Sequence, residues 1–134
     1  MNAVLVDTNV LLDVVTDDPG WADWSQRTLE AMAVKAPLII NPVIYAELSI
    51  GFARIEEVDA VLSEARIGLV EIPRPALFLA GKVFRTYRRQ GGRRTGVLPD
   101  FFIGAHAAVA GLPLVSRDAG RYRTYFPSLT LVAP

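Results

Sequence analysis

Residues 4–12 read VLVDTNVLL, and this segment is the strongest indication of the fold in the sequence. Its first three residues are an uninterrupted aliphatic run, which predicts a short buried strand. Apolar residues then recur at helical spacing through Val15, so a helix is expected to follow the strand directly. Asp7 stands at the junction, and functional groups in parallel α/β sheets gather where a strand ends and its helix begins. The stretch therefore predicts both a structural unit and a candidate site.

Later stretches of the chain repeat this order of strand and helix. Further strands are expected at residues 38–40, 69–72, 113–116 and 129–132. Further helices are expected at residues 21–35, 42–52, 55–65, 75–90 and 99–110. Because the strands are continuously apolar and alternate with helices, we predict an α/β fold with a central, mostly parallel sheet of about five strands and helices on both faces. The length of 134 residues predicts a single domain, 1–134.

The composition restricts the class of protein. Apolar residues make up 51% and charged residues 21% of the chain, which is typical of a folded protein and not of a disordered one. The absence of cysteine excludes disulfides and thiolate metal sites and agrees with a cytoplasmic location. The first residues have no signal-peptide pattern, and no apolar run approaches the roughly 20 residues that span a bilayer. We therefore expect a cytoplasmic protein without a membrane segment.

Charge is distributed unevenly along the chain. Residues 1–71 contain twelve acids and four bases, whereas residues 72–134 contain two acids, Asp100 and Asp118, and ten bases. Such asymmetry suggests an anionic partner, although both halves could simply fold together with their charges in water. Five arginines lie in or just before a glycine-rich loop at residues 91–96: Arg85, Arg88, Arg89, Arg93 and Arg94. These side chains are candidates for contacts with nucleic-acid phosphates.

Four acids occupy positions from which they could converge. Asp7 follows the first strand, Glu47 lies on the helix after the second, and Asp118 lies just past the fourth. Asp100 belongs to the first turn of the helix that precedes the fourth strand. Each has an ordinary interpretation as a helix cap, as a charge at a helix end, or as the partner of a distant arginine. However, Glu47 and Asp100 share helix faces with apolar residues, where unpartnered carboxylates are rare.

Convergence of these acids would require a cation. Two carboxylates about 5 Å apart repel by roughly 3 kcal/mol at an effective dielectric constant of about 20. Four carboxylates make six such pairs, and the sum approaches the whole stability of a domain, about 5–15 kcal/mol. Oxygen ligands without cysteine favour a hard divalent ion, Mg²⁺ or Mn²⁺. Such sites hydrolyse phosphodiesters by activating water.

These residues resemble the motifs of the PIN domain family. The similar stretches are residues 6–12, 46–48, 99–107 and 114–118, and the chain length and residues 122–127 resemble VapC toxins of toxin–antitoxin pairs. The resemblance covers nearly the whole chain, with all four motif acids in order. It implies that Asp7, Glu47, Asp100 and Asp118 form the catalytic and metal-binding site. It also implies that Asn9 and Ser116 support that site.

The resemblance has further implications for structure and activity. It implies a Rossmann-like PIN domain that acts as a Mg²⁺- or Mn²⁺-dependent endoribonuclease. It also implies a homodimer, and a cognate VapB-like antitoxin that covers the active site. RNA as the substrate rests on this resemblance alone, because metal-assisted hydrolysis does not need the 2′-hydroxyl.

Three other functions remain open from the residues. A haloacid-dehalogenase-like phosphatase also has an acid after its first strand, but it normally has a second Asp where this chain has Asn9. It also needs a lysine, and Lys35 and Lys82 are the lysines of this chain. A phosphoryl-accepting receiver domain would need an Asp after the third strand, where none is found. The third possibility is a non-catalytic PIN-like domain that only binds RNA or a partner.

Two other features of the sequence have competing interpretations. His106 lies six residues after Asp100, about 240° around a helix, so it is expected to point away from the acids and to pack or face solvent. Residues 121–126 interleave arginines with aromatic residues. This tail could stack on single-stranded RNA or form a short helix that packs its aromatic side chains inward.

Overall fold

A computed structural model describes residues 2–94 and 96–134. Over these residues the chain forms one five-stranded parallel sheet and seven helices, which confirms the predicted α/β fold. The sheet order is β3-β2-β1-β4-β5. The strands are β1 (Val4–Val6), β2 (Leu38–Ile40), β3 (Ile67–Leu69), β4 (Leu114–Val115) and β5 (Leu131–Val132). Within this described part of the chain, no helix is long and apolar enough to cross a membrane.

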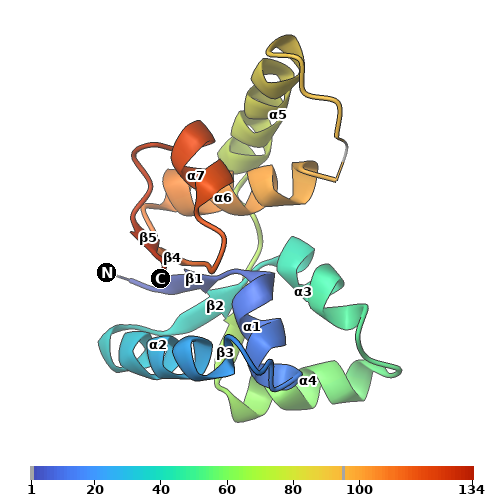
Figure 1. Cartoon of the computed structure of the whole chain (residues 1–134), viewed down its shortest axis with the longest axis vertical. Helices are drawn as coiled ribbons and strands as arrows, with labels where there is room; N and C mark the ends of the chain where they lie inside the picture. Colours follow the sequence, from blue (N-terminus) through green and yellow to red (C-terminus); the bar gives the residue numbers. More distant parts are fainter. Residues whose placement is uncertain (1, 95) are drawn as a thin grey trace.

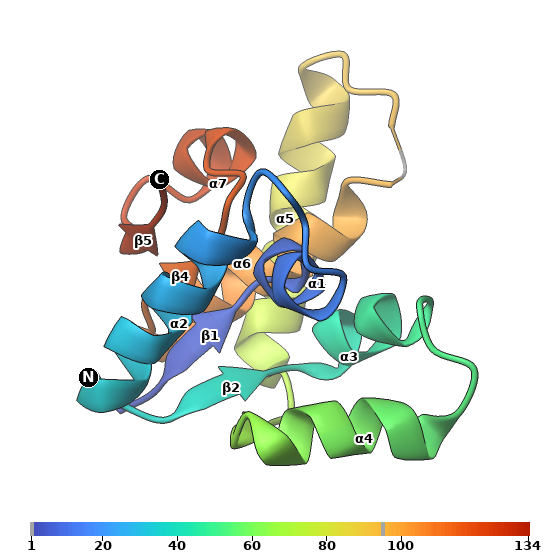
Figure 2. The ribbon, with the colours of Figure 1, turned by 60° about the horizontal axis from the view of Figure 1, so that its bottom comes forward.

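The helices cover both faces of the sheet (Figure 1). They are α1 (Thr8–Val15), α2 (Ala22–Lys35), α3 (Pro42–Ser49), α4 (Ile55–Glu64), α5 (Arg74–Arg89), α6 (Leu98–Ala110) and α7 (Gly120–Tyr125). α1, α2 and α4 lie on one face, and α5, α6 and α7 lie on the other. Figure 2, turned to bring the first face forward, shows α2 beside β1 and β2 and α4 beside α3. α3 contacts α1 and α6.

The strand order places the site at the centre of the sheet. The chain leaves β1 through α1 towards β2 on one side, and it leaves β4 through α7 towards β5 on the other. β1 and β4 are neighbours, so their carboxyl ends diverge at a topological switch point, where open α/β sheets bind ligands. The three residues of β1 are fully buried, which explains their uninterrupted apolar character.

Local signals in the sequence explain where the helices near this point begin and end. Asp7 is the N-cap of α1, and its carboxylate accepts a hydrogen bond from the backbone N–H of Thr8. Asn41 caps α3 by accepting from the N–H of Ile44, and a proline stands in the first turn. α6 ends at Gly111, whose positive φ of 66° is the left-handed conformation that glycine tolerates.

Three elements differ from those expected by more than one residue at an end. The third strand is Ile67–Leu69 and not residues 69–72, because its partner β2 ends at Ile40, where the cap of α3 begins. The fifth strand is limited to Leu131–Val132, and α3 ends at Ser49, three residues before Phe52. The expected loop at residues 91–96 includes Thr95, which lies outside the described residues.

Candidate active site

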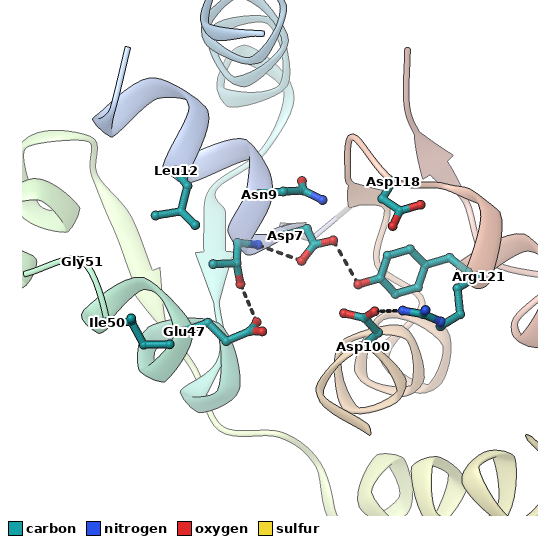
Figure 3. Close-up of a pocket in the computed structure, with 11 residues that line it drawn as sticks. Asp7, Asn9, Leu12, Glu47, Ile50, Gly51, Asp100, Asp118 and Arg121 are labelled. Atoms are coloured by element: carbon teal, nitrogen blue, oxygen red, sulfur yellow. Dashed lines mark hydrogen bonds and ion pairs between the residues drawn. The ribbon is translucent and has the colours of Figure 1, made fainter. Parts of the chain in front are cut away.

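A pocket of about 440 Å³ opens at the carboxyl end of β1 (Figure 3). Four separate elements of the chain supply its acidic side chains: Asp7, Glu47, Asp100 and Asp118. Figure 3 shows Asp7 near the middle, Glu47 on one side, and Asp100 and Asp118 on the other. The structure therefore brings the four acids to one pocket, while their role as metal ligands stays a prediction.

Asp7 is the buried acid of this pocket. Its side chain is 5% exposed, and one carboxylate oxygen accepts hydrogen bonds from the Ser116 hydroxyl at 2.8 Å and the Tyr122 hydroxyl at 3.0 Å. Burial raises the pKa of Asp7 to about 6, against the hydrogen bonds from Ser116 and Tyr122, which lower it. The negative charge of Asp100 raises this pKa further, so the two carboxylates interact directly through their fields. Asp7 is thus held in a fixed orientation, and it would be stabilised by a nearby cation.

Glu47 is held by a hydroxyl and not by a basic side chain. The Thr8 hydroxyl donates to its Oε1 at 2.7 Å, which joins the start of α1 to α3. Behind the pocket, the Asn41 side chain lies 3.1 Å from Nδ1 of His106, which joins α3 to α6. His106 is buried, as expected from its spacing to Asp100, and burial lowers its pKa. The His106 imidazole therefore packs between α3, which carries Glu47, and α6, which carries Asp100.

Asp100 forms an ion pair with Arg121 of α7, and both side chains are more than a quarter exposed. Partial burial raises the pKa of Asp100, the positive charge of Arg121 lowers it, and the negative charge of Asp118 raises it. The neighbouring Tyr122 is buried, and burial together with the charge of Asp7 raises its pKa well above the usual value. Residues 121–126 therefore contribute to a short packed helix, which was one of the two interpretations of this stretch. They also supply Arg121 and Tyr122 to the pocket.

Asp118 is exposed on the turn after β4, and this turn is tied to α1. The Ser116 hydroxyl accepts from the Asp118 N–H at 3.1 Å, and Asn9 accepts from the Arg117 N–H at 3.1 Å. Asn9 and Ser116 thus lie where a supporting role requires them. Their effect on activity stays a prediction.

A buried ion pair that the sequence did not indicate lies next to this turn. Arg117 binds Asp13 of α1 through two hydrogen bonds of 2.9 and 3.0 Å, and Ser25 donates to the same carboxylate. Asp13 is 3% exposed, and the Arg117 guanidinium lies 5.2 Å from the ring of Trp21. Asp13 lies three residues after the buried Val10 and shares its helix face, and this is the signal in the sequence that could have indicated a partner.

The donor set of the pocket suits a hard divalent ion, because all four acids offer oxygen and one of them is deeply buried. Among the residues that the structure describes, however, no three Asp, Glu or His side chains already stand close enough to hold an ion. The reason is visible in their partners: Glu47 is turned to Thr8, Asp100 to Arg121, and the Tyr122 hydroxyl contacts Asp7. The residues therefore fit an ion by their chemistry, and their side chains are held by other partners in this structure.

The predicted phosphate-binding arginines lie away from the pocket. Arg85, Arg88 and Arg89 are exposed on the C-terminal half of α5, which projects from the sheet (Figure 1), and Arg93 and Arg94 are exposed just after it. None of the five lines the pocket, so their contact with RNA stays a prediction. The lysines Lys35 and Lys82 do not line it either, so the pocket lacks the lysine that a dehalogenase-like phosphatase requires.

Solved structures with the same fold include toxin–antitoxin complexes. A chain in the crystal structure of VapBC2 from Rickettsia felis, bound to a promoter DNA fragment, matches with a TM-score of 0.76 and 20% identity over 98% of both chains. VapBC-1 from nontypeable Haemophilus influenzae matches with a TM-score of 0.70 and 19% identity over 98% of this chain and 97% of that one. DNA-bound VapBC from Salmonella typhimurium matches with a TM-score of 0.69 and 19% identity over 99% and 98% of the two chains.

Sequence comparison gives the family. A search of curated proteins finds no match. A family model described as PIN domain matches residues 4–127, a segment that contains all four acids of the pocket. Because this match covers far more than half of the chain, the protein belongs to the PIN domain family.

Proposed function

We propose that this chain is a Mg²⁺- or Mn²⁺-dependent endoribonuclease, built as a single PIN domain, and that it is the toxin of a toxin–antitoxin pair. The observation that carries the proposal is the pocket at the switch point, where Asp7, Glu47, Asp100 and Asp118 come from four separate elements. Acids with no common role would be scattered over the surface and would each face water, whereas these four acids line one cavity. Family membership supports the same conclusion.

The residues of the pocket have distinct parts in this proposal. Asp7 and Asp100, with Glu47 and Asp118 at the sides, would hold the divalent ion, which supplies water activation and neutralises charge that develops on the phosphate. Ser116 and Tyr122 fix the orientation of Asp7 by donating to it. Glu47 Oε1 is occupied by the Thr8 hydroxyl, so Oε2 is the oxygen that can accept a proton from the attacking water.

The proposal is tested by cleavage of total RNA with and without Mn²⁺. Asp100→Asn should lower the rate at least about 100-fold, because it removes one of the negative charges that would hold the divalent ion. Asp23→Asn is the matched control, since Asp23 also lies in the first turn of a helix but outside the pocket. It should cleave at the wild-type rate. RNA binding without cleavage in Mn²⁺ would favour the non-catalytic alternative instead.

We also propose a VapB-like antitoxin as the partner. The solved structures with the same fold include VapBC complexes, some of them bound to DNA. The pocket itself offers a partly apolar surface, because Leu12 and the exposed Ile50 lie beside Glu47 (Figure 3). Co-expression with the product of a short neighbouring reading frame should yield a complex that no longer cleaves RNA. A complex that retains full cleavage would contradict coverage of the site.

The remaining parts of the proposal concern assembly and substrate contacts. We propose a cytoplasmic homodimer, and the exposed Leu77 and Phe78 on α5 supply an apolar surface for it. Phe78→Glu should convert the dimer to a monomer in sedimentation equilibrium. The RNA backbone beyond the pocket would be held by the five predicted phosphate-binding arginines, Arg85, Arg88, Arg89, Arg93 and Arg94.

A further inference from the structure

Arg121 is the single cation among the described residues that line the pocket. It reaches in from the short helix α7 and pairs with Oδ2 of Asp100 (Figure 3). The arginine side chain is 28% exposed and the aspartate 29% exposed, so neither is locked in the core. A cation in an acid pocket needs an explanation, because it occupies the oxygen that a divalent ion would also bind.

The ion pair with Arg121 and a bound divalent ion would compete for the negative charge of Asp100. In the protein without a divalent ion, the positive charge of Arg121 pairs with the Asp100 carboxylate at the rim of the pocket. A divalent ion beside Asp100 would replace that charge and repel the guanidinium. A half-exposed arginine on a surface helix can then turn without unfolding its element, because its stem is long and flexible.

The substrate offers the displaced arginine a new partner. A guanidinium is a planar fork of N–H donors that matches two oxygens of a phosphate. Among the described residues that line the pocket, the other charged side chains are the four carboxylates, and these would repel a phosphate. Exchange of Arg121 from carboxylate to phosphate would therefore give both the phosphate and the guanidinium a partner of opposite charge.

Resting on the ribonuclease function proposed above, we propose that Arg121 exchanges partners: it neutralises Asp100 in the metal-free protein, and it donates to the RNA phosphate once Asp100 binds the divalent ion. Arg121 is then a competitor for metal binding and a contributor to catalysis at once. An arginine with a purely structural role would have neither effect. The two roles have opposite signs, so they can be separated by measuring two quantities on one variant.

The experiment uses the full chain, with Mn²⁺ affinity measured by calorimetry in the absence of RNA and with kcat and KM measured on single-stranded RNA. Arg121→Gln should bind Mn²⁺ about 2- to 5-fold more tightly, since it removes a competing ion pair of ordinary surface strength. Its kcat should fall by about 100-fold, since it removes one donor to the reacting phosphate. Arg123→Gln removes the same charge from the same helix but outside the pocket, and its Mn²⁺ affinity should match the wild type.

Arg121→Lys keeps the positive charge but loses the planar guanidinium that can donate to two phosphate oxygens. Its Mn²⁺ affinity should therefore stay near the wild-type value, while its kcat falls about 10-fold. This variant also carries the test if Arg121→Gln does not fold, as judged by circular dichroism. Unchanged or weaker Mn²⁺ binding by folded Arg121→Gln, or full activity of Arg121→Lys, would overturn the exchange. Failure of the wild-type chain itself to bind Mn²⁺ and cleave RNA would instead overturn the proposed function, and the exchange with it.

Discussion

The negative charge of Asp7 disfavours folding, although its carboxylate is well supplied with hydrogen bonds. It caps α1 and accepts two hydroxyl hydrogen bonds, yet burial raises its pKa to about 6 from 3.8. A carboxyl group whose pKa is higher in the folded protein stabilises the fold most when it is protonated. That contribution is complete below about pH 4 and is lost as the pH rises towards 6.

The direction of this pH dependence predicts how Asp7 affects the stability of the protein when a chelator removes divalent ions. The shift of about two pKa units corresponds to about 3 kcal/mol that Asp7 removes from the free energy of unfolding between about pH 4 and 7. Asp7→Asn should therefore unfold at higher urea concentration than the wild type at pH 7, with the difference shrinking at pH 4. Added Mn²⁺ should stabilise the wild type and leave Asp7→Asn nearly unchanged. A variant that is less stable than the wild type at pH 7 would show that the hydrogen bonds outweigh the charge.

The candidate site was predictable only in part at this scale. The four acids could be found because strand ends and helix starts place them in the sequence itself. Arg121 and Tyr122 could not be assigned to the pocket, because the direction of a side chain on a short helix depends on how that helix packs. Thr8 also escaped notice, since a threonine after a capping aspartate has many ordinary uses. The partners of the acids are therefore tertiary information.

At the scale of elements, the ion pair between Asp13 and Arg117 joins α1 to the turn that carries Asp118. Arg117→Ala would leave the 3% exposed Asp13 carboxylate without a cation, which should cost about 3 kcal/mol or more of unfolding free energy. Asp13→Ala should cost less, because Arg117 is 32% exposed and can turn to water. Urea denaturation of both variants and of the double variant measures this order. Equal losses for the two single variants would contradict it.

The packing of α6 against the tail gives a second prediction for elements. A Cβ at Gly104 would lie 2.5 Å from the ring of Phe126, which is itself buried. Gly104→Ala should therefore destabilise the protein by about 1–3 kcal/mol despite the better helix propensity of alanine. Gly81→Ala on α5 meets nothing within 4 Å and should be neutral or stabilising by up to about 1 kcal/mol. Thermal melts of the pair separate close packing from propensity.

The displaced third strand shows why element boundaries were harder to predict than elements. Residues 69–72 contain three apolar residues, but Leu69 and Val70 are exposed at the edge of the sheet, and Ile67 is the residue of β3 that is buried. Pairing begins at Leu38 and ends at Ile40, because Asn41 leaves the strand to cap α3. The length of a strand is thus limited by its neighbour, which a local pattern does not contain.

At the scale of the whole molecule, the acids of the first half and the bases of the second are parts of one fold. The family match and the sheet follow from the sequence pattern, whereas the position of the basic residues relative to the pocket depends on how far α5 projects. If Arg88 and Arg89 bind phosphates, the affinity for single-stranded RNA in chelator should depend on salt. Each arginine changed to glutamine should reduce the slope of log affinity against log salt by about 0.7. Lys35→Gln, a matched loss of charge from α2, should leave the slope unchanged.

The contact between Asn41 and His106 has a consequence for how such pockets diversify. Neither residue lines the cavity, yet the pair connects α6, which bears Asp100, to the N-cap of α3, which bears Glu47. Substitution of Asn41 or His106 would change the distance between Glu47 and Asp100, while every residue that lines the pocket stayed the same. Proteins with identical catalytic motifs could in this way differ in the ion they prefer, and comparison of motifs alone would not reveal it.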